Sequence, residues 1–325
     1  MMLMEKPAEP VLITRSNELG RLVELLGEQK IIAVDTESNS LYAYFERVCL
    51  IQFSTDEADF LVDPLTLNEL SPLGEIFSDP DIEKVFHAAE YDLLCLKRDF
   101  GFEFANLFDT LVAARILGWQ AVGLGSILKQ QFDVHVNKRY QRANWGRRPL
   151  PREMLNYARI DTHYLVPLRN RLKGNLEQTD LLPLALEDFN RLCSVNGSLV
   201  DNHDPDQGQT IDIWRISGSS DLTPQQATVF HELCCYRDKV ARRIDRPWFK
   251  VISDQTLLEI ASRTPMNRRQ LSMINGMSEK QMRRHADGIL TAISDGLNSN
   301  PLYPPRQPRP SRRYLNRLER LRTWR

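Results

Sequence analysis

The N-terminal part of the chain changes its pattern once, and this change limits the fold more than any other feature. Three apolar runs come first, IIAVD (31–35), VCLIQFS (48–54) and DFLV (59–62), and each has the length of a buried strand. From Leu67 onward, helical patterns alternate with short extended ones. Strands followed by such alternation predict an α/β domain, in which helices flank a mixed sheet.

The remaining elements follow from the same patterns. They are helix 17–26, helix 67–77, strand 83–86, helix 88–98, an extended piece at 104–107, helices 110–117 and 123–132, a long helix from about 152 to 172, and another helix near 179–193.

The second half of the chain follows a different pattern. Residues 196–210 are rich in Asn, Asp, Gly and Gln, which indicates a linker. Residues 221–297 show helical periodicity without strands, and the tail has prolines followed by a short basic helical pattern, YLNRLERLRTWR. The expected organisation is an N-terminal extension (1–11), an α/β domain with a trailing helix (12–195), a linker (196–220), a small all-helical domain (221–297) and a Pro/Arg-rich basic tail (298–325).

Several classes of protein are excluded or disfavoured. No run approaches the roughly 18 consecutive apolar residues of a membrane span. The N-terminus, MMLMEKPAEP, lacks the pattern of a signal peptide, so a cytoplasmic location is expected. Five cysteines without CxxC spacing indicate neither a disulfide framework nor a zinc site.

The net charge of −1 conceals an uneven distribution. Residues 1–110 hold 8 Lys+Arg and 22 Asp+Glu, residues 137–173 hold 10 basic and 2 acidic residues, and the last 25 residues hold 8 Arg and one Glu. Such asymmetry is a reason to consider a polyanionic partner, although solvated helix faces explain it equally well. A specific function must therefore be sought in motifs.

Four carboxylates and a tyrosine form the strongest candidate site. Asp35 and Glu37 end an apolar strand and project from the same face. Asp92 falls in the first turns of the helix after strand 83–86, while Tyr157 and Asp161 share a helix face at a spacing of four. Each motif alone is commonly structural. Together, four carboxylates can hold two Mg²⁺ ions, which prefer oxygen ligands and can activate a water for phosphodiester hydrolysis, with Tyr157 orienting that water.

D-T-E (35–37), Y-D (91–92) and Y-x-x-x-D (157–161) resemble the three motifs of the DEDDy group of 3′→5′ exonucleases, which have a ribonuclease H-like fold. The flanking text KVFHAAEYDL (84–93), NKRYQRANWGRRPL (137–150) and NYARIDTHYLVPL (156–168) is similar to that of the ribonuclease D family over residues 12–175. This resemblance implies removal of nucleoside 5′-monophosphates from an RNA 3′ end with two divalent ions, Mg²⁺ or Mn²⁺. It makes Asp35, Glu37, Asp92 and Asp161 metal ligands.

Three positions needed separate interpretation. Ser38 stands where the family often has a large apolar residue, which leaves packing against the terminal nucleotide open, and Asn144 replaces the Asp usual before Trp. Asp109 is a possible fifth carboxylate, but it follows an extended segment and precedes a helix. We therefore expect Asp109 to be an N-cap.

Two regions are candidates for binding RNA. The basic segment, residues 137–173, supplies cations and aromatic rings that suit single-stranded RNA. The candidates are Lys138, Arg139, Arg142, Trp145, Arg147 and Arg148. A loop whose aromatics pack inward is the alternative. Residues 222–271 and 274–285 resemble the HRDC domain, a helical module that assists nucleic-acid binding, and the resemblance makes Arg242, Arg243, Arg246 and Lys250 candidates there.

The resemblance implies an RNA with a free 3′ end as the partner, with tRNA precursors as the expected substrate. No membrane is expected from the hydropathy pattern, and no obligate protein partner is evident in the sequence. Two alternatives remain open. The first is a DNA-directed 3′→5′ exonuclease, because no residue that reads the 2′-hydroxyl is identifiable in the sequence. The second is a catalytically silent nucleic-acid-binding module, which the presence of all five chemical residues argues against.

Overall fold

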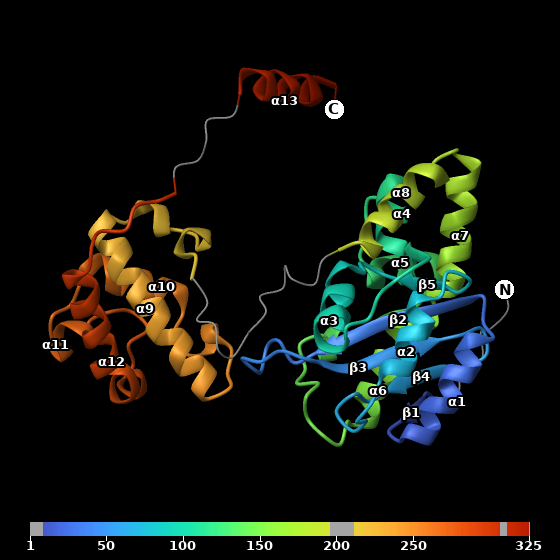
Figure 1. The fold of residues 1–325 in the computed structure, drawn as a ribbon, viewed down its shortest axis with the longest axis horizontal. Helices are drawn as coiled ribbons and strands as arrows, with labels where there is room; N and C mark the ends of the chain where they lie inside the picture. The colour runs from blue at the N-terminus through green and yellow to red at the C-terminus, as the bar shows by residue number, and fades with distance from the viewer. Residues whose placement is uncertain (1–8, 196–210, 306–310, 325) are drawn as a thin grey trace. The chain divides into compact units, whose positions relative to one another are not determined.

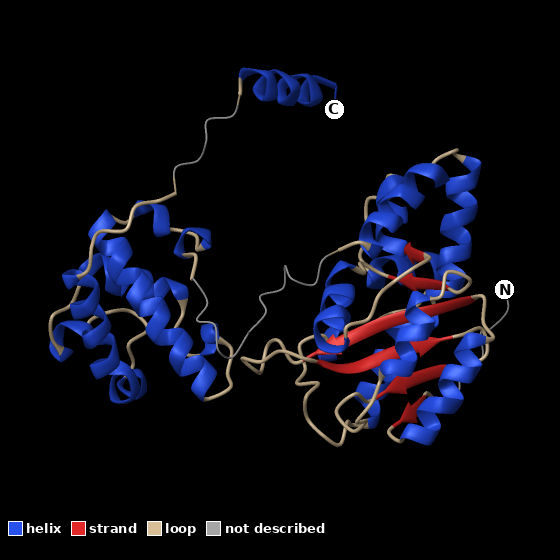
Figure 2. Cartoon of the chain, viewed as in Figure 1, coloured by secondary structure: helices blue, strands red, loops and turns tan. Residues whose placement is uncertain are grey.

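The structure is a computed structural model that describes residues 9–195, 211–305 and 311–324. It divides into two compact units, Met1–Gly208 and Gln209–Arg325 (Figure 1). Within the described residues, all strands belong to the first unit, whereas the second is helical (Figure 2). The predicted α/β fold with a flanked mixed sheet is therefore confirmed, and no helix in the described ranges is long and apolar enough to cross a membrane.

The six-stranded sheet has the order β1-β4-β3-β2-β5-β6. Its strands are β1 (Val11–Ile13), β2 (Ile31–Ser38), β3 (Val48–Ser54), β4 (Asp59–Val62), β5 (Glu83–Phe86) and β6 (Leu107–Asp109). β2, β3 and β4, which correspond to the three predicted strands, form an antiparallel meander, and β5 and β6 extend the sheet in parallel beyond β2. The sequence did not predict β1, because three residues at a sheet edge carry no periodic signal.

Helices cover both faces of this sheet. The helices of the first unit are α1 (Ser16–Gly27), α2 (Ser71–Ser78), α3 (Glu90–Phe100), α4 (Thr110–Ile116), α5 (Leu124–Phe132), α6 (Arg152–His163), α7 (Leu165–Gln178) and α8 (Leu182–Cys193). Ile32 and Val34 of β2 pack in one core with residues of α1, α2 and α3. Ala33, on the opposite face, packs in a second core with α4 and α7, while α6 contacts β2, β3 and β4. β2 is thus covered on both sides.

The predicted long helix at 152–172 is two helices. α6 ends at His163 and α7 begins at Leu165, with Tyr164 between them at φ −99° and ψ 0°. Pro167 lies in the first turn of α7, where its missing N–H costs no hydrogen bond. In one continuous helix, the His163 carbonyl would instead be left without the donor at position 167. The periodic pattern continues across this break, so the sequence did not reveal it.

The second unit is built around two long helices that pack against each other, α9 (Pro224–Arg243) and α12 (Glu279–Asn298). The shorter helices α10 (Asp254–Arg263) and α11 (Arg268–Leu271) contact them. A side chain at Gly296 would lie 2.6 Å from Val229 Cα, so glycine allows α9 and α12 to approach closely. Most of the predicted linker, 196–210, lies outside the described residues. Ile213, at its end, is buried in a short 3₁₀ helix, η3 (Ile213–Arg215), that contacts α9.

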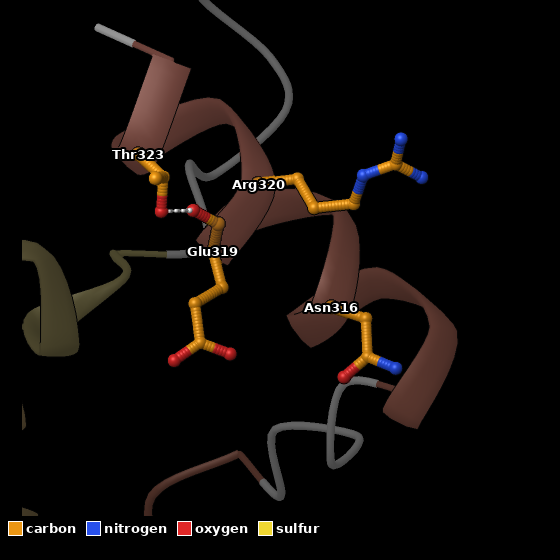
Figure 3. A pocket seen from close by; sticks show the side chains of 4 residues that line it. All are labelled: Asn316, Glu319, Arg320 and Thr323. Carbon is orange, nitrogen blue, oxygen red and sulfur yellow. Dashed lines mark hydrogen bonds between the residues drawn. The ribbon is translucent and has the colours of Figure 1, made fainter.

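The first residues of the predicted tail belong to the second unit. The Leu302 N–H donates to Thr228 Oγ1 at 2.8 Å and to the Pro224 carbonyl at 3.1 Å. The predicted basic helix is α13 (Arg312–Trp324). Its polar side includes Asn316, Glu319, Arg320 and Thr323, and the Thr323 hydroxyl donates to the Glu319 carbonyl at 2.9 Å (Figure 3).

Candidate active site

The D-T-E motif lies within β2 and not after it. β2 continues to Ser38 because Asp35 pairs with Gln52 and Glu37 pairs with Leu50 of β3. The register then shifts between Glu37 and Ser38. This extension corrects the expected end of the strand, and it holds both carboxylates in regular backbone close to the end of a paired strand.

Asp92 lies in the first turn of α3, as the sequence predicted. The Thr36 hydroxyl donates a hydrogen bond to Asp92 Oδ1 and so joins β2 to α3. Asp109 supports the same turn, because it accepts hydrogen bonds from the N–H groups of Ala88 and Ala89 at 3.1 and 2.8 Å. It also accepts from Leu111 and Val112, which confirms its predicted role as the N-cap of α4.

Tyr157 and Asp161 lie one turn apart on α6, which contacts β2 from the face opposite Ile32 and Val34. Tyr157 is buried, and its ring centre lies 6.0 Å from that of Tyr140 and 6.1 Å from that of Trp145. The phenol is therefore held between two aromatic side chains of the basic segment.

The four carboxylates behave electrostatically as one cluster. Burial raises the pKa of Asp35 well above its usual value, and the charges of Asp92, Asp161 and Glu37 raise it further. The pKa of Glu37 is also raised, by burial and then by Asp161 and Asp92. Burial raises the pKa of Asp161 to about 7, with a further contribution from Asp92. Four acids from three elements therefore share one site.

Burial likewise raises the pKa of Asp92 to about 7, although the hydrogen bond from Thr36 opposes this shift. Among the described residues, none of the four carboxylates forms a salt bridge with a lysine, arginine or histidine. Negative charge at this site has no cation from the described chain to offset it.

This donor set suits divalent cations, because Mg²⁺ and Mn²⁺ prefer carboxylate oxygens. Within the described ranges, no three Asp, Glu, His or Cys side chains already stand in an arrangement that would hold a metal ion. The four acids therefore lie near one another, but their side chains do not yet have the geometry of a metal site. Burial and these acids raise the pKa of Tyr157 too, so its phenol stays protonated and can donate a hydrogen bond without acting as a strong base.

A cavity of about 190 Å³ opens beside Thr36 and Glu37, and its other walls include Ser38, Tyr91, Gln141 and Trp145. Ser38 donates to Glu46 Oε1 at 2.8 Å, and the Tyr91 hydroxyl donates to the same oxygen. Arg98 pairs with the other Glu46 oxygen at 3.2 Å. Ser38 is thus anchored by a polar network, which the sequence analysis missed because Glu46 lies in no motif.

The candidate RNA-binding residues of the basic segment fall into two groups. Lys138, Arg139, Arg142 and Arg147 are exposed. Arg148 has a structural role, because its guanidinium donates to Asp63 at 2.5 and 2.6 Å and to the Cys49 carbonyl at 2.7 Å. Trp145 is 1% exposed, so it supports Tyr157 and offers no free face to a base. The inward-packing alternative is therefore correct for Trp145.

Two of the four predicted cations of the second unit, Arg246 and Lys250, line a cavity. Arg242 and Arg243 end α9. A cavity of about 360 Å³ begins just beyond them and is lined by Arg246, Lys250, Lys280 and Arg284. Ser278, the N-cap of α12, lies on the same cavity, so a helix N-terminus adds to its positive character.

Comparison with known proteins shows the family of each unit. Residues 10–177 match the 3′-5′ exonuclease family model, and residues 226–293 match the HRDC domain model. The chain belongs to the 3′-5′ exonuclease family and carries an HRDC domain. Within that family it is ribonuclease D-like, as the similarity to individual proteins indicates.

The chain is 32% identical over 308 residues to "Exosome complex exonuclease RRP6" of Saccharomyces cerevisiae, which covers 89% of this chain and 41% of the yeast protein. It is 38% identical over 264 residues to "Exosome complex component 10" of Mus musculus, covering 78% and 29% of the two chains. The chain therefore spans less than half the length of these relatives.

Two solved structures share most of the fold. The catalytic core of RRP6 from Trypanosoma brucei has a TM-score of 0.75 at 30% identity and covers 91% of this chain and 81% of its own. RNase D from Escherichia coli, described as an exoribonuclease involved in structured RNA processing, has a TM-score of 0.73 at 25% identity and covers 98% and 84%.

Proposed function

We propose that this protein is a 3′→5′ exoribonuclease that hydrolyses RNA from its 3′ end and releases nucleoside 5′-monophosphates. One observation carries the proposal: carboxylates from β2, α3 and α6 lie close enough together that the charges of Asp92, Asp161 and Glu37 add to burial in raising the pKa of Asp35, and Tyr157 lies one turn from Asp161. Such a cluster suits two divalent cations, and family membership supports the same chemistry.

In this proposal, Asp35, Glu37, Asp92 and Asp161 hold the ions. When bound, two divalent ions would supply a Lewis acid that favours ionisation of the attacking water and stabilises the leaving oxygen. The protonated Tyr157 phenol donates a hydrogen bond that orients the water for attack. Trp145 and Tyr140 pack against the ring of Tyr157, which is buried, and hold it in place.

RNA is favoured over DNA as the substrate by the relatives' names, which refer to exosome components and to structured RNA processing. We propose structured RNA precursors, with tRNA precursors among them. The exposed Lys138, Arg139, Arg142 and Arg147, together with the basic cavity of the HRDC domain, are proposed to bind phosphates.

A cytoplasmic location and action without an obligate protein partner remain part of the proposal. The names of the exosome components make association with other RNA-degrading proteins the competing expectation. Size-exclusion chromatography coupled to light scattering, followed by an activity assay on the isolated chain, separates the two. Full activity of a monomer supports independent action, whereas inactivity that is restored by cell extract contradicts it.

The function is tested with 5′-labelled RNA and DNA of the same sequence, each incubated with Mg²⁺, Mn²⁺ or EDTA. We expect a ladder of RNA products shortened one nucleotide at a time from the 3′ end, and no shortening in EDTA. Faster shortening of the DNA would favour the DNA-directed alternative. Binding of RNA without shortening under any metal would instead identify a binding module.

A further inference from the structure

A second cavity, of about 630 Å³, lies beside the active site in the first unit. The residues that matter for its chemistry are Tyr42, Tyr140, Ala143, Asn144, Arg147 and Met154. Its volume lies within the range of roughly 300–1,000 Å³ that is usual for small-molecule sites. None of the four proposed metal-binding acids lines this cavity.

This cavity adjoins the catalytic one. Ala143 lines both cavities, so a single small side chain lies on the boundary between them. Tyr140, in the 3₁₀ helix η1 (Lys138–Tyr140), forms another wall, and its ring meets that of Tyr157 at 62° with 6.0 Å between centres. A group in the second cavity would therefore lie next to the RNA nucleotide at which Tyr157 orients the attacking water.

The walls suit a nucleobase. Tyr42 and Tyr140 supply aromatic surface, and Met154 supplies an apolar one. The Tyr42 hydroxyl donates to the Arg142 carbonyl at 2.8 Å, which fixes the ring before any ligand arrives. A stacking surface that is already ordered loses little conformational entropy on binding.

The rim suits a phosphate. Arg147 is exposed, and within the described part of the chain its side chain forms no salt bridge. Its neighbour Arg148 is already held by Asp63 and by backbone carbonyls, which keeps the rim in place. The cavity thus offers one available guanidinium beside two aromatic rings, the combination that binds single-stranded nucleic acid.

We propose that this cavity is a subsite for an upstream nucleotide of the RNA, whose base stacks on Tyr42 and Tyr140 while Arg147 binds an adjacent phosphate. The proposal rests on the proposed exonuclease function and deepens it. Tyr140 is a positioning residue in this scheme, since it contacts both the upstream base and the ring of Tyr157. A substrate too short to reach the cavity would lose both the stacking and the phosphate contact.

The test is an abasic scan. A set of RNAs carries a single abasic nucleotide at each of the positions upstream of the 3′ end, and binding is measured by fluorescence anisotropy in EDTA, where no turnover occurs. For the parent protein, we expect one position at which loss of the base weakens binding by about 5- to 150-fold. Tyr42→Leu should remove most of that sensitivity, and Arg147→Ala should weaken binding of every RNA in the set.

Arg191→Ala serves as the matched control, because Arg191 is an exposed arginine of the same unit that pairs with Asp188 at 2.9 Å. It should bind all RNAs as the parent does. Circular dichroism and thermal melts confirm that each variant is folded. If Tyr42→Leu keeps the full abasic sensitivity of the parent, or if the parent shows none, the subsite is disproved.

Activity is measured separately, so the two proposals can fail separately. A parent that shows the abasic effect but hydrolyses no RNA would overturn the exonuclease function while leaving the binding cavity in place. For an active parent, Tyr42→Leu should raise KM for long substrates with little change in kcat, and Tyr140→Leu should lower kcat as well. Equal effects of both variants on kcat would contradict the positioning role of Tyr140.

Discussion

The hydrogen bond from the Thr36 hydroxyl to Asp92 Oδ1 joins the strand that carries Asp35 and Glu37 to the helix that carries Asp92. Asp161 comes from α6, which contacts the other face of the sheet. Thr36 thus lies between Asp35 and Glu37 in the chain and fixes their strand to Asp92. The residue between the two acids of the D-T-E motif therefore has a structural role of its own.

Replacing Thr36 with valine should weaken metal binding. The shape of the side chain is kept, but Asp92 loses the hydrogen bond that orients it, and loss of such a supporting bond typically costs about 10- to 100-fold in metal affinity or activity. A titration of activity against Mg²⁺ measures the change. Thr36→Ser, which keeps the hydroxyl, should resemble the parent; an unchanged Mg²⁺ requirement in the valine variant would contradict the assigned role.

Asp35→Asn and Asp161→Asn should each abolish turnover and leave the fold intact, because each removes a ligand and not a core side chain. Asp56→Asn, in the exposed turn between β3 and β4, is the matched control and should be fully active. Release of nucleotides from labelled RNA measures the effect. Retained activity in either of the first two variants would show that the acids are wrongly assigned.

The metal-free protein should lose stability as pH rises from about 5 to 8. The pKa of Asp92 and of Asp161 is about 7 in the folded protein, above the ordinary value of 3.8, so the folded state binds more protons than the unfolded state between these values. Stability therefore falls with rising pH in that interval. Thermal melts in EDTA should show this decline.

The same melts with Mg²⁺ should show greater stabilisation at pH 8 than at pH 5.5, because the ions bind the deprotonated acids. Asp92→Asn removes one titrating group, so its melting temperature in EDTA should fall less than that of the parent over this pH range. A parent whose melting temperature in EDTA falls no more than that of the variant from pH 5 to 8 would contradict the charge cluster.

Tyr157→Phe should lower kcat by about 100-fold, the scale expected when a reacting group is misplaced, and leave RNA affinity nearly unchanged. Phenylalanine preserves the packing between Tyr140 and Trp145, so only the hydroxyl is lost. Single-turnover rates and anisotropy measure the two quantities. A large loss of affinity would point to a structural role for the tyrosine instead.

Truncation after Pro305 should weaken RNA binding and flatten its salt dependence. The removed segment contains α13, whose arginines can displace counterions from phosphates, and each phosphate contact contributes about 0.7 to the salt slope for a single strand. The cut preserves the contacts of Leu302 with α9. An unchanged slope would show that the tail does not contact RNA phosphates.

The order of strands and helices could largely be predicted, because the buried strands appear as short apolar runs whereas the helices show a helical period. The sequence also placed Asp92 in a helix start and Asp109 at a cap, since both follow from local rules. The break at Tyr164 and the edge strand β1 could not be found in this way, because a periodic pattern does not end at Tyr164 and three residues are too few to show one.

Side-chain roles in the basic segment were less predictable. Arg147 and Arg148 are adjacent and chemically identical, yet one is exposed and the other is held by Asp63, 85 residues away in the chain. Only tertiary contacts distinguish them. The network of Ser38, Glu46 and Tyr91 has the same origin, since it joins residues from three separate segments.

The acids of the active site are attached to two different hydrophobic layers, since α3 packs in one core and α6 in another, on opposite faces of the sheet. The distances between these acids therefore depend on how tightly both layers pack against the sheet between them. A distant substitution that loosens either layer should first reduce the affinity for divalent ions, well before the protein unfolds. The affinity for divalent ions should thus report on the packing of both faces of the sheet.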